Sequence, residues 1–284
     1  MCERQYSRGR LPARDAGLRA GKRQARAMPA RSCPTLTMDE SRLYIGCAGW
    51  GLNSAVAERF PGEGSHLERY ARILPAVEIN SSFYRPHKPE TYARWRDGTP
   101  PGFRFSVKLP RAITHEGRLV AYREPLERFA GEVAHLGSKL GCLLVQLPPS
   151  MPFDAGAADA FLADLRARLD VPTVCEPRHA GWFGEEASAL LARHGVVRVV
   201  ADPPAVPHAP LPRPAPTVYF RLHGSPHVYH SRYDDELLAR VAGECRRHLA
   251  AGRRVWCIFD NTASGAAQPN ALRLAEMCAD TSGT

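Results

Sequence analysis

The chain has 284 residues, of which 44% are hydrophobic and 24% charged, and these values are ordinary for one globular domain or two small ones. No apolar run approaches the roughly 18 residues that a membrane helix needs, and the basic N-terminus lacks the apolar stretch of a secretory signal. The composition therefore excludes an integral membrane protein, and we expect no membrane partner. The eight cysteines form no C-x-x-C pair, which argues against a zinc ribbon or a disulfide framework and predicts a cytoplasmic location.

Most of the positive net charge lies at the N-terminus. Residues 1–37 carry nine Lys and Arg against two acidic residues, whereas the remaining 247 residues hold 29 basic and 27 acidic side chains. Residues 1–40 lack hydrophobic periodicity, so we expect a disordered basic extension there and a single domain over 41–284. Two interpretations of the extension stay open: an arm that binds nucleic acid, or a mis-assigned start with Met38 as the first residue, which we favour.

Eight short apolar runs follow in chain order. They cover residues 43–48, 76–80, 103–109, 142–147, 172–176, 196–201, 217–222 and 254–260. Each run is nearly continuous in Val, Ile, Leu, Phe and Cys rather than alternating with polar residues, which is typical of parallel strands buried on both faces. We therefore predict eight parallel strands.

The segments between these runs are typical of helices. Ser65 and Glu68 match a capping box, and Pro125 suits the first position of a helix whose apolar residues recur at helical spacing as far as Leu140. Further helices are expected over 161–169, 237–249 and 270–278.

Eight strands that alternate with helices over about 240 residues predict an α/β fold of the (β/α)8 TIM-type barrel class. Segment 203–216, between the sixth and seventh strands, holds seven prolines in 14 residues and should be a non-helical connection. An open doubly wound sheet is the alternative. No glycine-rich phosphate turn follows the first strand, and the sequence shows no nucleotide-cofactor motif.

Polar side chains stand at the carboxyl end of nearly every predicted strand, where a barrel places its chemistry. The candidate ligand-binding residues are Asn80, Tyr84, Arg85, Lys108, His115, Gln146, Arg178, Trp182, Arg221 and Asn261. The candidate catalytic residues are Glu78, Glu176, His179, His223 and Asp260. Because a polar group buried without a partner is unfavourable, this phased set predicts one ligand site at the barrel mouth.

Short motifs recur in order: IGCAGW from residue 45, VEINSSFYR from 77, GFRFSVKLPRAITH from 102, PLERF from 125, GCLLVQLPPS from 141, EPRHAGWF from 176, FRLHG from 220 and WCIFDN from 256. With these motifs, residues 43–280 closely resemble the DUF72 (YecE-like) family. The resemblance implies a TIM-type barrel of uncharacterised biochemical function. The family pattern falls on Glu78, Asn80, Phe83, Tyr84, Lys108, Thr114, His115, Gln146, Glu176, Arg178, His179, Trp182, Arg221, His223, Gly224 and Asn261.

The chain departs from that pattern in three places. The loop after Trp50 lacks the aromatic residues common there in the family. Asp260-Asn261 replaces the usual Asn-Asn pair, and residues 265–267 lack an expected aromatic side chain. Substrate details that depend on the loop after Trp50 or on the loop after the last strand therefore cannot be inferred from the resemblance.

The ionisable candidates each have a functional and a structural interpretation. Glu78, Glu176 and Asp260 are equally consistent with acid–base or metal-binding roles and with ion pairs to neighbouring Arg or Lys. Lys108 is more informative, because an ammonium on the inward half of a strand needs a carboxylate or a phosphate beside it. A divalent metal is a candidate cofactor, although the spacing of its candidate ligands fixes no coordination geometry. Those ligands are His115, Glu176, His179 and His223.

The sequence thus predicts an enzyme that binds a small anionic ligand or a phosphate-bearing sugar or nucleotide moiety. Arg178, Arg221 and Lys108 would hold the anion, while Glu78 and Glu176 would transfer protons together with His179 or His223. Hydrolysis of a phosphoester or glycosidic bond and isomerisation both fit. The alternatives are a nucleic-acid-binding barrel or a phosphodiesterase like endonuclease IV, and a non-catalytic binding protein. The oligomeric state is left open.

Overall fold

The computed structural model describes residues 42–52 and 56–279. The predicted basic extension over 1–40 and the alternative start at Met38 lie outside these residues. In the described part, no helix is long and apolar enough to cross a membrane.

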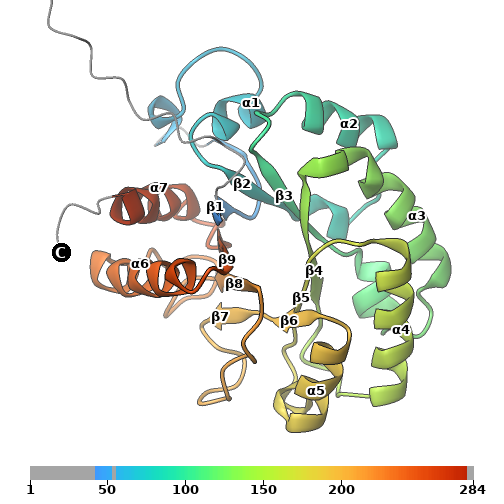
Figure 1. Ribbon diagram of the computed structural model, residues 1–284. Helices are drawn as coiled ribbons and strands as arrows, with labels where there is room; N and C mark the ends of the chain where they lie inside the picture. Colours follow the sequence, from blue (N-terminus) through green and yellow to red (C-terminus); the bar gives the residue numbers. More distant parts are fainter. Residues whose placement is uncertain (1–41, 53–55, 280–284) are drawn as a thin grey trace, which may run out of the picture. The chain divides into compact units, whose positions relative to one another are not determined.

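The described residues form nine strands in two parallel sheets (Figure 1). One sheet has the order β1-β9-β8-β7 and the other the order β2-β3-β4-β5-β6. The strands are β1 (Leu43–Cys47), β2 (Ala76–Ile79), β3 (Arg104–Lys108), β4 (Leu140–Gln146), β5 (Thr173–Glu176), β6 (Val196–Arg198), β7 (Val200–Asp202), β8 (Thr217–Leu222) and β9 (Arg254–Phe259). The predicted α/β class with parallel strands is therefore confirmed.

The two sheets adjoin at two places. Val199 alone separates β6, which pairs with β5, from β7, which pairs with β8. The predicted strand over 196–201 is therefore interrupted at Val199, because the chain pairs with β5 before this residue and with β8 after it. At the other place, Ala48, just after β1, forms a single parallel bridge with Glu78 of β2.

The helices lie on the outer side of the strands (Figure 1). The predicted capping box is confirmed: Ser65 Oγ accepts from the Glu68 amide at 3.3 Å, and Glu68 Oε2 accepts from the Ser65 amide at 2.6 Å. The helices are α1 (His66–Ala71), α2 (Pro89–Asp97), α3 (Arg123–Val133), α4 (Ala155–Arg168), α5 (Glu185–Arg193), α6 (Asp235–Ala250) and α7 (Ala267–Ala279).

Both boundaries of α3 differ from the prediction, and α4 and α7 begin six and three residues before their predicted first residues. Pro125 is the third residue of α3 rather than the first, which the helix tolerates because the amides of its first turn have no intrahelical acceptor. The periodicity as far as Leu140 does not continue one helix, because α3 ends at Val133 and Gly137 adopts a positive φ of 54°. The proline-rich segment 203–216 is non-helical, as predicted.

The strands bury two different faces. One hydrophobic cluster joins strand residues to the helices, whereas a second, smaller one contains only residues of the strands and the junction between β6 and β7. The members of the second cluster are Tyr44, Ala76, Cys142, Leu144, Val174, Val199, Tyr219, Trp256 and Ile258. Because side chains alternate along a strand, the residue two places further on faces the same way. Those next residues include Glu78, Gln146, Glu176, Arg221 and Asp260, so the polar candidates lie directly above this apolar layer.

Candidate functional site

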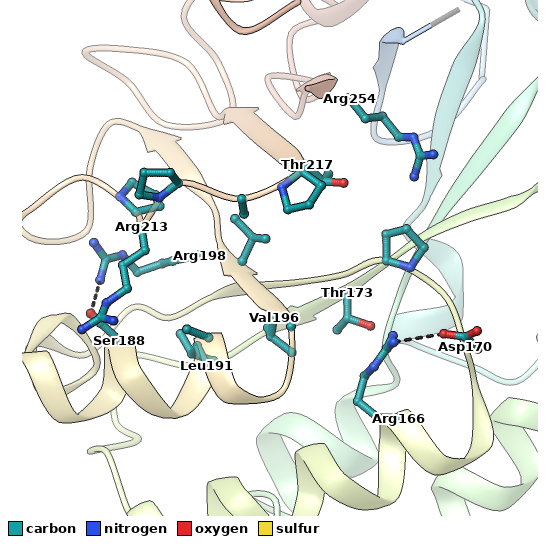
Figure 2. A pocket seen from close by; sticks show the side chains of 18 residues that line it. Arg166, Asp170, Thr173, Ser188, Leu191, Val196, Arg198, Arg213, Thr217 and Arg254 are labelled. Atoms are coloured by element: carbon teal, nitrogen blue, oxygen red, sulfur yellow. Dashed lines mark hydrogen bonds and ion pairs between the residues drawn. The ribbon is translucent and has the colours of Figure 1, made fainter. Parts of the chain in front are cut away.

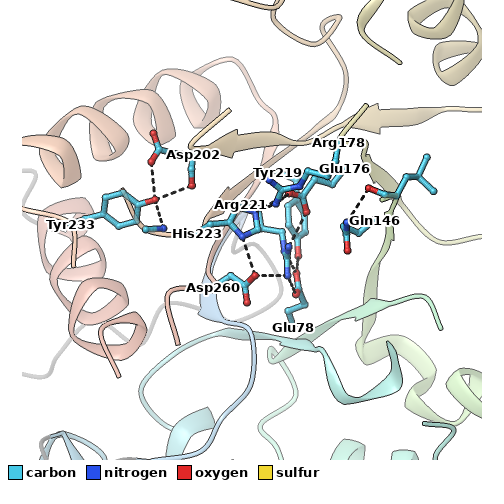
Figure 3. Close-up of polar contacts among 12 residues, drawn as sticks. Glu78, Gln146, Glu176, Arg178, Asp202, Tyr219, Arg221, His223, Tyr233 and Asp260 are labelled. Carbon is cyan, nitrogen blue, oxygen red and sulfur yellow. Dashed lines mark hydrogen bonds and ion pairs between the residues drawn. The ribbon is translucent and has the colours of Figure 1, made fainter. Parts of the chain in front are cut away.

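Arg221, on β8, is the centre of the polar cluster (Figure 3). Its Nε and Nη2 contact the two carboxylate oxygens of Glu78 at 3.1 and 2.7 Å. Its Nη1 donates to Glu176 Oε2 at 2.9 Å, and Nη2 also lies 3.0 Å from Asp260 Oδ2. All four residues are buried. Each of the three guanidinium nitrogens therefore contacts a carboxylate. Glu78, Glu176 and Asp260 thus form ion pairs with an arginine, as the structural interpretation of these residues expected.

Two further residues, Tyr219 and Ser106, extend the hydrogen-bond network of Glu78. The Tyr219 hydroxyl donates to Glu78 Oε2 at 2.9 Å and lies 2.9 Å from Ser106 Oγ. Burial, and then the Glu78 charge, raise the pKa of Tyr219, so the phenol stays a donor. The sequence interpretation missed both residues. The signal was present, since Tyr219 and Ser106 stand two places before Arg221 and Lys108 on the same strand faces.

His223 lies between two carboxylates. Its Nδ1 is 3.0 Å from Asp260 Oδ2 and its Nε2 is 2.8 Å from Glu176 Oε1. Burial opposes the charged imidazolium, but the hydrogen bonds to Asp260 and Glu176 outweigh it, and the pKa of His223 is raised. Burial likewise disfavours the Glu176 and Asp260 carboxylates, yet Arg221 and His223 together hold both carboxyl pKa values below their usual range.

Arg178 closes the outer side of this group and is 19% exposed. Its Nη2 lies 2.5 Å from Glu176 Oε1 and 2.7 Å from His223 Nε2. A neutral His223 can therefore donate from Nδ1 to Asp260 and accept at Nε2 from Arg178, whereas a protonated His223 donates from Nε2 to Glu176. Nε2 is thus the atom at which this ring can gain or lose a proton.

Lys108, at the end of β3, differs from the other cations. It is only 7% exposed, and its Nζ lies 4.0 Å above the centre of the Phe83 ring. Within the described residues, no carboxylate is within ion-pair distance of it and no side-chain hydrogen bond holds its Nζ. Burial lowers the pKa of Lys108 to about 8, and the neighbouring Arg221 acts in the same direction against the partial opposition of the three carboxylates.

The remaining polar candidates surround this cluster. Gln146 donates from Nε2 to the Leu147 carbonyl at 3.0 Å. Asn261 donates from Nδ2 to the Ser231 carbonyl and to Asn270 Oδ1. The buried Oδ1 atoms of Asn80 and Asn261 have no hydrogen-bond partner in the described part of the chain. Tyr84 and Arg85, four and five residues after Asn80, are exposed.

The candidate metal ligands do not assemble. His115 Nδ1 lies 2.9 Å from Thr114 Oγ1, and His179 Nδ1 accepts from the Gly181 amide at 3.0 Å. Both ring nitrogens of His223 are already engaged. Across residues 42–52 and 56–279, no group of three or more His, Cys, Asp or Glu side chains is placed to hold a metal ion.

Trp182, a candidate ligand-binding residue, is packed into the interior of the protein. The ring is 2% exposed, its Nε1 donates to the Met151 carbonyl at 3.1 Å, and it packs edge-on against Phe153.

Two cavities lie at opposite ends of the strands. One, of about 430 Å³, is lined by the first residues of β5, β6, β8 and β9 and by several arginines (Figure 2). Two of these arginines are already neutralised, Arg166 by Asp170 and Arg213 by Glu185. The other, of about 520 Å³, lies at the carboxyl ends of β1 and β9. A further cavity of about 240 Å³, lined by Phe83, Tyr84 and Arg85 among others, follows the carboxyl ends of β2 and β3. Ligands of parallel α/β folds bind at the carboxyl ends, so these two are the relevant spaces.

Comparison with known proteins identifies the family. The model of the family described as "Protein of unknown function DUF72" matches residues 44–283. The chain belongs to the DUF72 family. The UPF0759 protein YecE of Escherichia coli K12 is 33% identical to this DUF72 chain over 166 residues, which are 56% of the chain and 59% of YecE. The UPF0759 protein YunF of Bacillus subtilis 168 is 26% identical over 182 residues, 60% of the chain and 64% of YunF. The matched stretches span less than two thirds of both curated relatives.

Two solved structures of DUF72 family proteins are similar to this DUF72 chain. The protein of Thermotoga maritima MSB8 has a TM-score of 0.68 at 26% identity, covering 83% of this chain and 98% of its own. The protein of Enterococcus faecalis V583 has a TM-score of 0.69 at 23% identity, covering 83% and 95%. These likenesses support the fold and assign no activity.

Proposed function

We propose that this DUF72 protein is an enzyme that binds a small anionic ligand at the carboxyl ends of its strands and transfers protons on it. A phosphate-bearing sugar or nucleotide moiety fits this description, and both hydrolysis and isomerisation use such chemistry. The observation that carries the proposal is the distribution of charge. Three carboxylates are turned toward Arg221, while Lys108 has no carboxylate partner in the described residues.

We also infer that the two sheets close into one (β/α)8 barrel. The single residue between β6 and β7 and the bridge from Ala48 to Glu78 support closure on both sides. In such a barrel β6 and β7 together act as the sixth of eight strands, and the Arg221 cluster lies at the mouth, where barrel enzymes carry their active sites.

Arg178 is the residue that fits contact with the anion. Only its Nη2 has a contact within the described residues, so Nε and Nη1 are available for a bidentate interaction. With His223 and Lys108 both protonated, the site holds four cationic side chains against three carboxylates, and this excess positive charge favours an anion. Arg221 then acts as a positioning residue, because its nitrogens are all occupied.

Proton transfer fits His223 and Glu176. A ligand anion that draws Arg178 outward removes the donor that faces His223 Nε2, and this nitrogen can then take up or release a proton. Glu176 Oε1 lies 2.8 Å from the same nitrogen and is the adjacent carboxylate. Asp260, on the other side of the ring, fixes its orientation through Nδ1.

The test is ligand binding by the full chain, measured by thermal shift and titration calorimetry. The ligands are inorganic phosphate, sugar phosphates, nucleoside monophosphates and a short single-stranded oligonucleotide. We expect phosphate-bearing small molecules to stabilise the protein and Arg178→Ala to weaken their binding at least tenfold, whereas Arg240→Ala, at an exposed ion pair on α6, leaves binding unchanged. Equal binding by the Arg178 variant would overturn the assignment. Tight binding of the oligonucleotide alone would favour the nucleic-acid alternative, which the exposed Tyr84 and Tyr229 would serve by stacking.

A further inference from the structure

We propose that Lys108 is a nucleophile that forms a Schiff base with the ligand, which makes the substrate class an aldehyde or ketone that also carries an anionic group. This inference rests on the proposed function, because it places the carbonyl of the same ligand beside Lys108 while its anion contacts Arg178.

The first argument is that Lys108 is the one cation of the described cluster without a counter-ion. Arg221 contacts three carboxylates, Arg178 contacts Glu176, and His223 lies between Glu176 and Asp260. A buried ammonium without a carboxylate loses hydration and gains no compensating ion pair. Burial therefore raises the fraction of neutral amine above that of an exposed lysine, although the contact with the Phe83 ring partly stabilises the ammonium, and the neutral amine is the nucleophilic form of lysine.

The second argument comes from the groups that surround the Lys108 amine. Arg221 is the cation whose charge lowers the pKa of Lys108, in addition to burial. A buried lysine beside another cationic group is activated in this way in Schiff-base enzymes. The other charged groups that act on it are Glu78, Asp260 and Glu176, which partly oppose this effect. Burial, and then the Lys108 charge, lower the pKa of His115.

The third argument is position. Lys108 is the last residue of β3, and its side chain lies over the Phe83 ring at the edge that carries the polar cluster. The Phe83 ring covers one side of the amine and excludes water from it. The charges of Glu78, Asp260 and Glu176 act on the same amine, so proton acceptors lie near the position where a carbonyl carbon would bind.

The chemistry is balanced and needs no oxidant or reductant. The Lys108 nitrogen lone pair attacks the carbonyl carbon, and the oxygen takes up a proton to give a carbinolamine. A second proton converts the hydroxyl into a leaving water while the nitrogen loses one of its own protons. The products are a protonated imine and water. The imine withdraws electrons from the adjacent carbon, so a C–H bond there becomes acidic enough for a neighbouring base to remove its proton.

The sequence makes the experiment selective, because the chain has only four lysines: Lys22, Lys88, Lys108 and Lys139. The full chain is incubated at pH 7 with pyridoxal 5′-phosphate, an aldehyde with a phosphate group, then reduced with borohydride and mapped by peptide mass spectrometry. We expect labelling of Lys108 at least tenfold faster than that of exposed Lys88, with a half-maximal rate near pH 8. Faster labelling of Lys88 at pH 7 would overturn the proposal.

Two comparisons separate this inference from the proposed function. Pyridoxal without the phosphate should label Lys108 more slowly, and inorganic phosphate should compete with pyridoxal 5′-phosphate. If phosphate stabilises the protein through Arg178 but Lys108 is not trapped, the anion site stands and the Schiff base is refuted. If Lys108 is trapped equally fast by both aldehydes and phosphate does not compete, the nucleophile stands and the anion site is refuted. Both comparisons use the wild-type chain, so neither depends on a variant that folds.

Discussion

Replacing Arg221 by methionine tests whether one buried guanidinium holds the three carboxylates together. The variant keeps the length of the side chain but removes its charge and every nitrogen that contacts Glu78, Glu176 and Asp260. Removing one partner of a buried ion pair leaves an uncompensated charge and costs about 3–5 kcal/mol. At about 2–4 °C per kcal/mol for a domain of this size, the melting temperature should fall by about 6–20 °C.

The pH dependence of this loss distinguishes charge from packing. In the wild type the pKa values of Glu176 and Asp260 are held down in the folded state, so these two groups stabilise the fold above their usual values of about 4 and lose that effect as the pH falls. In the Arg221→Met variant Glu78 loses its ion-pair partner, while Glu176 and Asp260 keep only His223 and, for Glu176, Arg178, and protonation relieves the uncompensated charge. The difference in unfolding free energy between the two proteins should therefore be largest at pH 7 and shrink toward pH 4.

Denaturant unfolding at both pH values, followed by circular dichroism, measures this difference. Arg240→Met is the matched control, because Arg240 is 63% exposed and its pair with Glu236 is solvated, so its loss should change stability little at either pH. An equal loss at pH 7 and pH 4 would mean that the packing of the Arg221 side chain matters and its charge does not. A loss below about 1 kcal/mol at pH 7 would refute the central role of Arg221.

Two further predictions concern the partners of this cluster. Tyr219→Phe removes the hydroxyl that donates to Glu78 and should cost about 1–3 kcal/mol of unfolding free energy. Tyr122→Phe is the control and should cost less, because the Tyr122 hydroxyl contacts the partly exposed Asp164. Equal losses of the two variants in denaturant unfolding would contradict this. Asp260→Asn should lower the pKa of His223, because it removes one of the two carboxylates that raise it. A raised pKa stabilises the fold below about pH 6.5 and loses this effect as the pH rises through the folded-state value, so that part of the stability profile should flatten in the variant. An NMR titration of the His223 imidazole measures this pKa shift. The control is Asp235→Asn, on the exposed surface of α6. An unchanged His223 titration in the Asp260 variant would show that Asp260 does not act on His223.

The strands could be predicted from the residues because burial on both faces demands continuous apolar runs, and seven of the eight runs correspond to one strand each. The helix start at Ser65 was predictable for a local reason, since the capping box involves atoms only three residues apart. The boundary at Gly137 was not, because its apolar neighbours continue the helical spacing while the backbone leaves it. The split at Val199 depends on which strands lie on either side, and that information is absent from the run itself.

For the candidate site, the residues alone determined which side chains stand at the carboxyl ends of the strands, because the apolar runs end there in polar groups. They could not determine the pairing among those groups. Glu78 and Arg221 are 143 positions apart and Glu176 and Arg221 are 45 apart, and only the folded arrangement of the sheets brings all three carboxylates to one guanidinium. The same arrangement leaves Lys108 without an ion-pair partner among the described residues. The carboxylates that were expected to pair with it instead contact Arg221.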